Sequence, residues 1–245
     1  MDPAEYDYLY DLEENLWWFV AQRRITEALL RKHLTRSGSP LKVLDAGAGT
    51  GGQLEQLQRF GQVTSFDFEP KAVEYFAQRQ RGRVLVASTD AIPFADNTFD
   101  LVTSFDVICQ LPSPNDEMAL KELSRVLKPG GTLYVRTPAL QALYGGHDVT
   151  LHTKHRYTTN EMARKMREAG LDVLQSTYAN TFLFPVAATR RLIAKVRHSS
   201  GESDVRAVSP MLNTALKTLF SVEATILPRT SLPVGLSVIA IARKP

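Results

Sequence analysis

The chain has 245 residues, of which 44% are hydrophobic and 22% are charged, and its formal net charge is +3. This composition is typical of a folded protein with a sizeable core. So small a charge excess is unlike the clustered basic stripe of a nucleic-acid-binding protein, and we expect no nucleic-acid partner. Cys109 is the one cysteine, which excludes an internal disulfide and leaves no zinc-ligand spacing.

The first residues, MDPAEYDY, lack the basic-then-apolar order of a secretory signal. No apolar run reaches the roughly 18 residues of a membrane-spanning helix, so we expect a cytoplasmic protein. Residues 4–36 then form a predicted helical arm with Trp17, Trp18 and Arg23. Two interpretations of the arm stay open. Its rings pack on the main domain, or the arm caps a ligand, with the tryptophans excluding water and Arg23 meeting an anionic group.

Residues 41–54 read LKVLDAGAGTGGQL, a short apolar run that ends at Asp45 and is followed by four glycines within six positions. The pattern predicts a buried parallel strand, a tight turn and a helix N-terminus. Glycine allows positive φ and lets a ligand approach the backbone, while the helix N-terminus offers free N–H groups. We therefore expect a nucleotide-like cofactor at this turn.

A second predicted strand, Gln62–Phe68, carries Asp67 near its end, about twenty residues after Gly47. In doubly wound folds an acid at this place accepts hydrogen bonds from a ribose diol. The alternative interpretation is a plain α/β crossover with a surface aspartate.

The glycine turn is followed by Ala87–Phe94 (ASTDAIPF), Asn97–Val102 (NTFDLV) and Leu127–Thr132 (LKPGGT). Together these motifs resemble the class I S-adenosylmethionine-dependent methyltransferases, in particular the type 11 branch of small-molecule and sugar methyltransferases. The resemblance covers roughly Val43 to Tyr134 and is specific for the cofactor, not for the acceptor.

The resemblance implies that S-adenosylmethionine is the cofactor. Asp90 would receive the adenine amine, the Ala91 N–H would meet a ring nitrogen, and Asp106 would face the methionine end and the acceptor. The implied cofactor-binding residues are Asp45, Ala46, Gly47, Gly49, Asp67, Phe68, Asp90, Ala91 and Asp106.

Many relatives have an acid–histidine pair where this chain has Cys109 and Gln110. This departure removes a possible general base and keeps open a cofactor-binding partner or sensor without turnover. A nicotinamide-dependent oxidoreductase is a second alternative. Asp45 before the turn disfavours it.

The segment 137–158 holds three of the five histidines, at positions 147, 152 and 155. Imidazole can accept a proton near neutral pH, so His147 or His155 is a candidate base. Similar chains carry a comparable H-D…H-x-R-Y stretch, which implies acceptor binding by Asp148, Arg156 and Tyr157, with Arg156 as the anion contact. Solvated loop histidines and a metal site are the alternatives, and we expect no metal.

Near the C-terminus, Asp172–Tyr178 is a predicted strand that pairs with an antiparallel last strand, Gly235–Arg243. Between them, residues 179–233 form a predicted insertion with helices over 182–196 and 211–227 and a linker at 199–204. Three roles of the insertion stay open: a lid over the acceptor, a homodimer surface, or a peripheral contact with a membrane.

We therefore predict one class I methyltransferase domain over residues 1–245, with its core sheet at 41–178 and 234–243. Its fold would be α/β, a Rossmann-like doubly wound seven-stranded sheet with an antiparallel last strand, an N-terminal helical cap and the helical insertion. Its acceptor would be a small molecule, methylated on an oxygen of a sugar, lipid-linked or secondary-metabolite compound.

Overall fold

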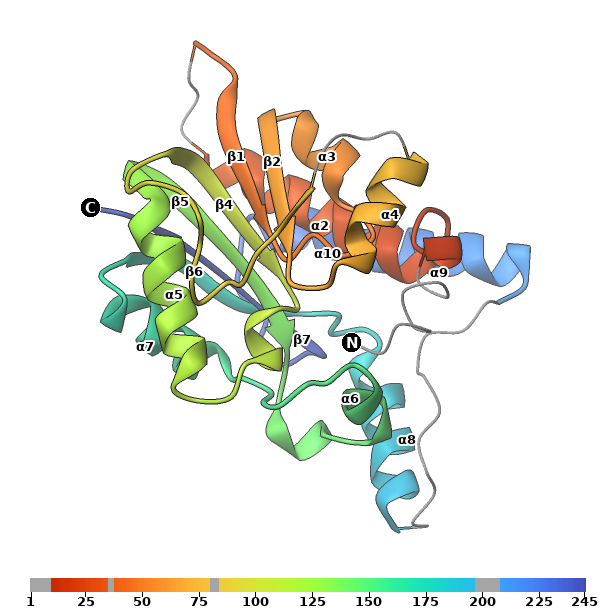
Figure 1. The fold of residues 1–245 in the computed structure, drawn as a ribbon. Coiled ribbons are helices and arrows are strands. Elements are labelled where there is room, and N and C mark those ends of the chain that lie inside the picture. Colours follow the sequence, from red (N-terminus) through yellow and green to blue (C-terminus); the bar gives the residue numbers. More distant parts are fainter. Residues whose placement is uncertain (1–9, 35–37, 80–83, 197–207) are drawn as a thin grey trace.

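The computed structural model describes residues 10–34, 38–79, 84–196 and 208–245. Its centre is one seven-stranded sheet in the order β3-β2-β1-β4-β5-β7-β6 (Figure 1). Strand β7 is antiparallel to β5 and β6, and the other neighbours are parallel. The predicted Rossmann-like sheet with an antiparallel last strand is confirmed. The strands are β1 Leu41–Ala46, β2 Gly61–Asp67, β3 Val84–Val86, β4 Phe99–Phe105, β5 Leu127–Pro138, β6 Asp172–Ala179 and β7 Ser237–Arg243.

The strand order reverses at β1, which pairs with β2 on one side and with β4 on the other. In open parallel sheets such a reversal leaves a crevice outside the carboxyl ends of the strands, where ligands bind. The polar residues that follow β1, β2 and β4 are therefore brought to one edge of the sheet.

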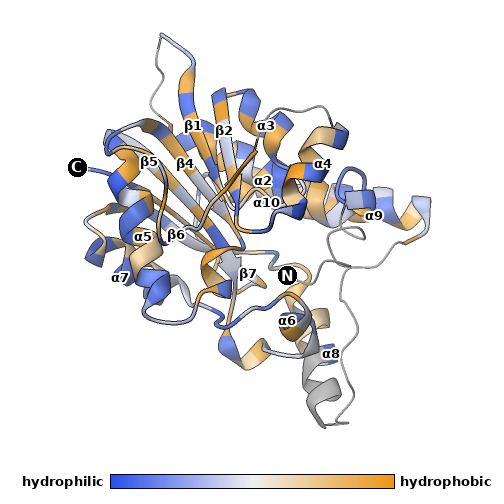
Figure 2. Ribbon diagram, viewed as in Figure 1, coloured by the Kyte–Doolittle hydropathy of each residue, from blue (hydrophilic) through white to orange (hydrophobic). Residues whose placement is uncertain are grey.

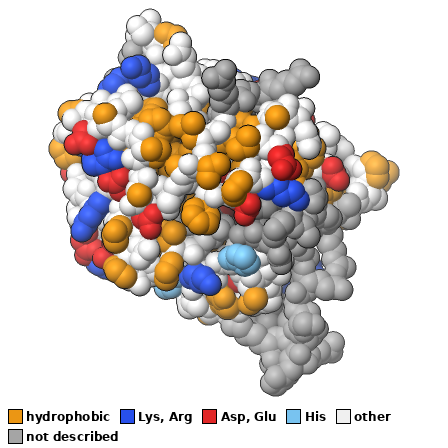
Figure 3. Space-filling model, viewed as in Figure 1, with side chains coloured by type: hydrophobic (Ala, Val, Ile, Leu, Met, Phe, Trp, Pro, Cys, Tyr) orange, Lys and Arg blue, Asp and Glu red, His pale blue; other side chains and the backbone are white. Residues whose placement is uncertain are grey.

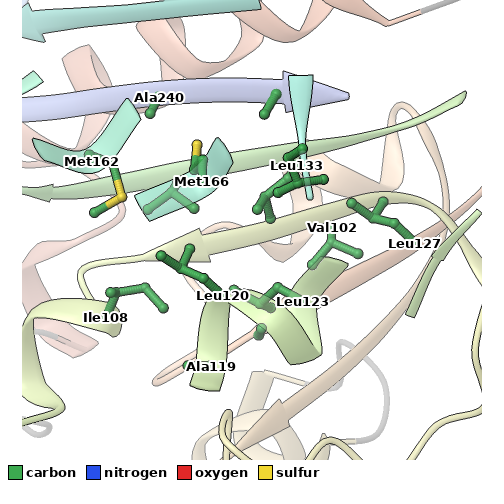
Figure 4. Packing of buried hydrophobic residues seen from close by; sticks show 14 of the residues in the cluster. Val102, Ile108, Ala119, Leu120, Leu123, Leu127, Leu133, Met162, Met166 and Ala240 are labelled. Atoms are coloured by element: carbon green, nitrogen blue, oxygen red, sulfur yellow. The ribbon is translucent and has the colours of Figure 1, made fainter. Parts of the chain in front are cut away.

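Each face of the sheet has its own core because successive strand residues point to opposite sides. Leu44, Val102 and Leu133 pack against α5 (Asn115–Val126) and α7 (Thr159–Glu168), as Figure 4 shows for part of this cluster. Their neighbours along the strands, such as Val43 and Tyr134, pack on the other face. Apolar residues accordingly follow the strands and the inward sides of these helices (Figure 2).

The second face is covered mainly by the arm helix α2 (Trp17–His33), with α3 (Leu54–Gln58) and α10 (Glu223–Ile226) beside it. Helix α4 (Lys71–Arg79) packs through Phe76 near β3. Strand β3 lies at the end of the sheet, and its Leu85 and Val86 are exposed. Hydrophobic side chains gather among acidic and basic ones on the face drawn in Figure 3.

The insertion has two parts. Helix α9 (Pro210–Ser221) and α10 pack on α2, and the predicted second helix is divided at Val222 between them. Helix α8 (Phe184–Val196) lies beside η2 (Gln141–Leu143) and extends away from the sheet (Figure 1). The predicted linker at 199–204 lies outside the described residues. Within the described ranges, no helix combines the length and apolar character needed to cross a bilayer.

One prediction about the connections was wrong. The segment 137–158, predicted as a loop, contains η2 and the short helix α6 (Gly146–Thr150). Helix α7 begins directly after this segment, where Thr158 accepts from the Glu161 N–H and forms a capping box with it.

Candidate active site

The glycine turn after β1 is tight at its start and open at its middle. Gly47 has φ +84°, and a Cβ there would lie 2.1 Å from Cγ2 of Val107. Gly49 has φ +53°, and a Cβ there would meet no atom within 4 Å. The N–H groups of Gly47 and Ala48 both donate to the Phe66 carbonyl, at 2.9 and 3.0 Å. The turn is thus anchored to β2 and leaves open space at Gly49, as a ligand approaching the backbone requires.

Asp67 joins two turns at the end of β2. Its Oδ2 accepts from the Gly49 N–H at 2.7 Å and its Oδ1 accepts from the Glu69 N–H at 2.9 Å. The carboxylate is therefore held at the strand tip, directly beside the glycine turn. The next residue, Phe68, is 76% exposed, which is unusual for so large an apolar ring.

Asp45 is the penultimate residue of β1, just before the glycines. Its carboxyl group is buried, and one of its oxygens has no hydrogen-bond partner. Its Oδ1 accepts from the Thr103 hydroxyl at 3.0 Å, while Oδ2 has no hydrogen-bond partner. Burial raises the pKa of Asp45 to about 7, and the Asp67 carboxylate raises it further. The Thr103 hydrogen bond and the Arg136 guanidinium act in the opposite direction. An acid in this state needs a cation to stabilise its charged form.

Asp106 follows β4 with a left-handed backbone, at φ +59°. Its N–H donates to the Arg136 carbonyl at 2.8 Å. Its Oδ2 accepts from Arg136 Nε at 3.0 Å and from Nη2 at 2.6 Å. The Asp106 side chain is 42% exposed and that of Arg136 is 8% exposed. A charge-compensated and partly exposed acid therefore lies at the carboxyl end of β4.

Cys109 and Gln110, in η1 (Ile108–Gln110), both donate to the Asp106 carbonyl. Burial raises the pKa of the Cys109 thiol well above its ordinary value. Cys109 is therefore a neutral thiol that braces the β4 tip, and it is not a nucleophile.

The turn after β3 is formed by Ser88–Ala91. Asp90 accepts from the Ser88 hydroxyl and, at 3.3 Å, from Asn115 Nδ2. The Ala91 N–H donates to the Ser88 carbonyl at 3.2 Å. The Ala91 N–H, predicted to meet a cofactor ring nitrogen, is thus used by the turn in this structure.

The arm lies on the glycine turn through Glu13. The Thr50 hydroxyl donates to Glu13 Oε1, and a Cβ on Gly52 would lie 2.2 Å from Glu13 Oε2. A dinucleotide would place its pyrophosphate at this point, in front of the helix that follows the glycines. The buried Glu13 carboxylate takes that space and would repel a phosphate, which argues against a nicotinamide cofactor.

The arm residues predicted to contact a ligand make other contacts. The Arg23 guanidinium donates to the carbonyls of Glu13 and Glu14, both at 2.7 Å, so it braces the arm itself. The Trp17 ring packs on Phe220 of α9 with centroids 4.8 Å apart, and Trp18 packs edge-on against Trp17. The anion contact predicted for Arg23, and a cap made by the Trp17 ring, are therefore corrected to intramolecular packing.

Three predicted acceptor-binding residues are buried in the protein. Asp148 Oδ1 accepts from Arg156 Nε at 2.8 Å, and both side chains are at most 3% exposed. Arg156 Nη1 also donates to the Ala139 carbonyl at 3.0 Å. Tyr157 is fully buried and donates to Asp116 Oδ2 at 2.8 Å. The polar groups of Asp148, Arg156 and Tyr157, predicted to bind the acceptor, therefore make buried contacts that hold the segment 137–158 together and fix it to α5.

The two candidate bases lie in the same segment. His155 Nε2 is 2.8 Å from Glu161 Oε1, and the His155 side chain is 38% exposed. The backbone N–H of His155 donates to the Cys109 carbonyl, which places His155 beside the end of β4. His147 is on α6 with its Nδ1 buried. Across the described part of the chain, no group of three His, Cys, Asp or Glu side chains is arranged to hold a metal ion.

Several groups of this site were not predicted: Glu13 on the glycine turn, Thr103 beside Asp45, and the Arg136–Asp106 pair. Arg136 had a recognisable signal, because it is a charged residue directly after the apolar run Leu133–Val135 of β5. The other two contacts join residues that are far apart in sequence and have no local signature.

Comparison with known proteins identifies the central segment. Residues 44–135 match the family model of the type 11 methyltransferase domain. A malonyl-(acyl-carrier protein) O-methyltransferase of Erwinia pyrifoliae is 36% identical over 121 residues, 47% of this chain and 44% of that protein. A ubiquinone/menaquinone biosynthesis C-methyltransferase of Shewanella pealeana is 30% identical over 137 residues, 51% of this chain and 53% of that protein.

The chain thus spans about half the length of the curated relatives it matches. Among solved structures, a chain from the complex of a methyltransferase with a methyltransferase activator of Haloferax volcanii has a TM-score of 0.62 at 19% identity. The match covers 99% of this chain and 93% of that one, which shows a shared fold. Residues 44–135 are therefore similar to the type 11 methyltransferase domain, and the relatives named above are methyltransferases.

Proposed function

We propose that this protein binds S-adenosylmethionine at the carboxyl ends of β1, β2 and β4 and transfers its methyl group to an oxygen of a small-molecule acceptor. The observation that carries the proposal is the buried, unpaired Oδ2 of Asp45 at the point where the strand order reverses. A cationic ligand with a ribose would satisfy that oxygen, and S-adenosylmethionine carries both an ammonium group and a ribose.

The neighbouring residues fit the rest of the cofactor. Asp67 is held at the strand tip, where it would accept from the ribose diol. The exposed ring of Phe68 offers a flat apolar surface to the adenine. Asp90, one strand further, would accept from the adenine amine. Ala46, Gly47 and Gly49 would let the cofactor approach the backbone.

When bound, the cofactor supplies a methyl group on a strongly electrophilic sulfonium. The chain would therefore contribute mainly alignment of the acceptor, and well-oriented reactants gain effective molarities of about 10⁵ M or more. The arm would exclude water, because Glu13 and Arg23 hold it over the glycine turn. Trp18, half-buried beside Trp17, is the remaining aromatic candidate for shielding the site.

His155 is the preferred candidate base. When its Nε2–H donates to Glu161, its Nδ1 is the basic atom, and the carboxylate stabilises the imidazolium that forms. A base of this kind accelerates such a step by about 10² to 10⁴-fold. His147 is less suitable because its Nδ1 is buried.

The named relatives differ in the acceptor that they methylate. One is a malonyl-(acyl-carrier protein) O-methyltransferase and another is a C-methyltransferase of ubiquinone/menaquinone biosynthesis. We favour a neutral hydroxyl of a sugar, lipid-linked or secondary-metabolite compound, since the Asp106 charge at the β4 tip is already balanced by Arg136.

The test begins with calorimetric titration of the protein with S-adenosylmethionine, S-adenosylhomocysteine and NAD. We expect micromolar binding of the first two and none of NAD. Release of S-adenosylhomocysteine is then measured with an acceptor panel. Binding without turnover on any acceptor would favour a cofactor-binding partner or sensor, and binding of NAD alone would overturn the proposal.

A further inference from the structure

Buried polar atoms without partners gather under the N-terminal half of α2. Gln22 is 1% exposed, and neither its amide oxygen nor its amide nitrogen has a hydrogen-bond partner. Arg136 is 7% exposed, and its Nη1 is likewise unpartnered although Nε and Nη2 bind Asp106. Native proteins rarely keep buried amide and guanidinium groups unpaired, so a missing ligand or ordered water is expected to bind here.

The packing of α2 on β5 brings Gln22 and Arg136 toward the same end of the sheet, where the parallel strands have their carboxyl ends. The Thr26 hydroxyl is hydrogen-bonded to the Tyr134 hydroxyl at 3.1 Å, which fixes α2 against β5. Helix α2 runs opposite to β5, because its last residue, His33, accepts from Arg243 at the other edge of the sheet. Gln22, one turn before Thr26, and Arg136, two residues after Tyr134, therefore both lie nearer the cofactor edge.

Asp45 belongs to the same sheet face. Val43, two residues before it, packs in one cluster with Tyr134. The Arg136 guanidinium is near enough to lower the pKa of Asp45, against the stronger effect of burial. An anionic group, a cationic group and an amide thus face one region, in which Asp45 Oδ2, Arg136 Nη1 and the Gln22 amide have no protein partner.

This combination selects a zwitterion. A plain anion at Arg136 would be repelled by Asp45 and Asp106, and a plain cation at Asp45 would be repelled by Arg136. An α-amino acid places an ammonium group and a carboxylate on one carbon, so it satisfies both ends. The amino-acid end of S-adenosylmethionine has this chemistry.

We propose that Gln22 and the Nη1 group of Arg136 bind the carboxylate at the amino-acid end of the cofactor, opposite the ammonium group at Asp45. The inference rests on the proposed function. It adds two binding residues, one from the arm and one from β5, and it gives the arm a direct contact with the cofactor.

The test is Gln22→Met, which keeps the length of the side chain and removes its amide. Its affinity for S-adenosylmethionine and for 5′-methylthioadenosine, which lacks the amino-acid end, is measured by calorimetry. We expect about a ten- to hundredfold loss for S-adenosylmethionine and no change for 5′-methylthioadenosine. The unliganded variant should melt at the same temperature as wild type or higher, because an unpaired buried amide is gone.

Arg136→Lys keeps a cation beside Asp106 but removes Nη1, and it should show the same selective loss. Thr26→Val is the matched control, since it breaks the hydrogen bond to Tyr134 one turn below. It should lower the melting temperature and leave both affinities unchanged. Wild-type affinity for S-adenosylmethionine in Gln22→Met, or an equal loss for both ligands, would overturn the inference alone. Failure of the wild-type protein to bind either ligand would overturn the proposed function with it.

Discussion

Cofactor binding is expected to weaken as the pH falls through 7, because Asp45 must be ionised to bind an ammonium group. Burial raises the pKa of Asp45 to about 7, and the Asp67 carboxylate adds to that rise. The Thr103 hydroxyl and Arg136 oppose it without restoring the ordinary value. Below pH 7 the unliganded protein therefore holds Asp45 mostly neutral, and binding must release its proton.

The size of the effect follows from this pKa. The apparent dissociation constant is multiplied by one plus the ratio of neutral to ionised Asp45. The factor is about 1.1 at pH 8, about 2 at pH 7 and about 11 at pH 6. Proton release on binding should rise in parallel, from about 0.1 per site at pH 8 to about 0.9 at pH 6.

The assay is calorimetry with S-adenosylmethionine at pH 6 and pH 8, each in two buffers of different ionisation enthalpy. Asp45→Asn is the control, and its weakened binding should not depend on pH in this range. Equal wild-type affinities at the two pH values, with no proton released, would refute the role of Asp45.

The same shift has a consequence for stability, and its sign is opposite to that of an ordinary paired acid. The folded-state pKa lies above the unfolded value of about 3.9, so the native state holds the proton more tightly. The free energy of unfolding should therefore fall as the pH rises from about 4 to about 7 and change no further above, by at most about 4 kcal/mol. Asp45→Asn should lose this dependence, and its melting curves at pH 5 and pH 8 measure that.

Three further predictions concern residues with distinct roles. Asp67→Ala should weaken S-adenosylmethionine binding by about a hundredfold while the protein stays folded by circular dichroism, and unchanged affinity would exclude the ribose contact. His155→Ala should lower turnover at saturating cofactor more than it lowers cofactor affinity, whereas equal losses would indicate a structural role. Asp148→Asn should lower the free energy of unfolding by about 3–5 kcal/mol in urea, because it leaves the Arg156 charge buried without its counter-ion. A wild-type unfolding midpoint for Asp148→Asn would contradict the buried ion pair.

Short-range sequence patterns sufficed to predict a segment's structure where the periodicity of its apolar residues and its bounding turn residues determine that structure. The predicted strand Asp172–Tyr178 agrees with β6, Asp172–Ala179, to within one residue. The glycine turn was equally readable, since positive φ at Gly47 and Gly49 strongly favours glycine.

The segment 137–158 shows where this reasoning failed. Asp148, Arg156 and Tyr157 are polar residues in a connection rich in histidine, which is also the composition of a binding loop. The structure buries all three, and a buried ion pair uses the same residue types as an anion site. Composition cannot separate these outcomes, because burial depends on what packs over the segment.

For this chain, local residue order was enough to predict the mostly parallel sheet and the acids at the strand tips. The partners of the polar groups depended on three-dimensional packing, as Glu13 on the glycine turn and Thr103 beside Asp45 show. The physical reason is that such contacts join residues more than thirty positions apart along the chain, where no periodicity links them. Their energies come from burial and charge, which exist only after α2 has packed on the sheet.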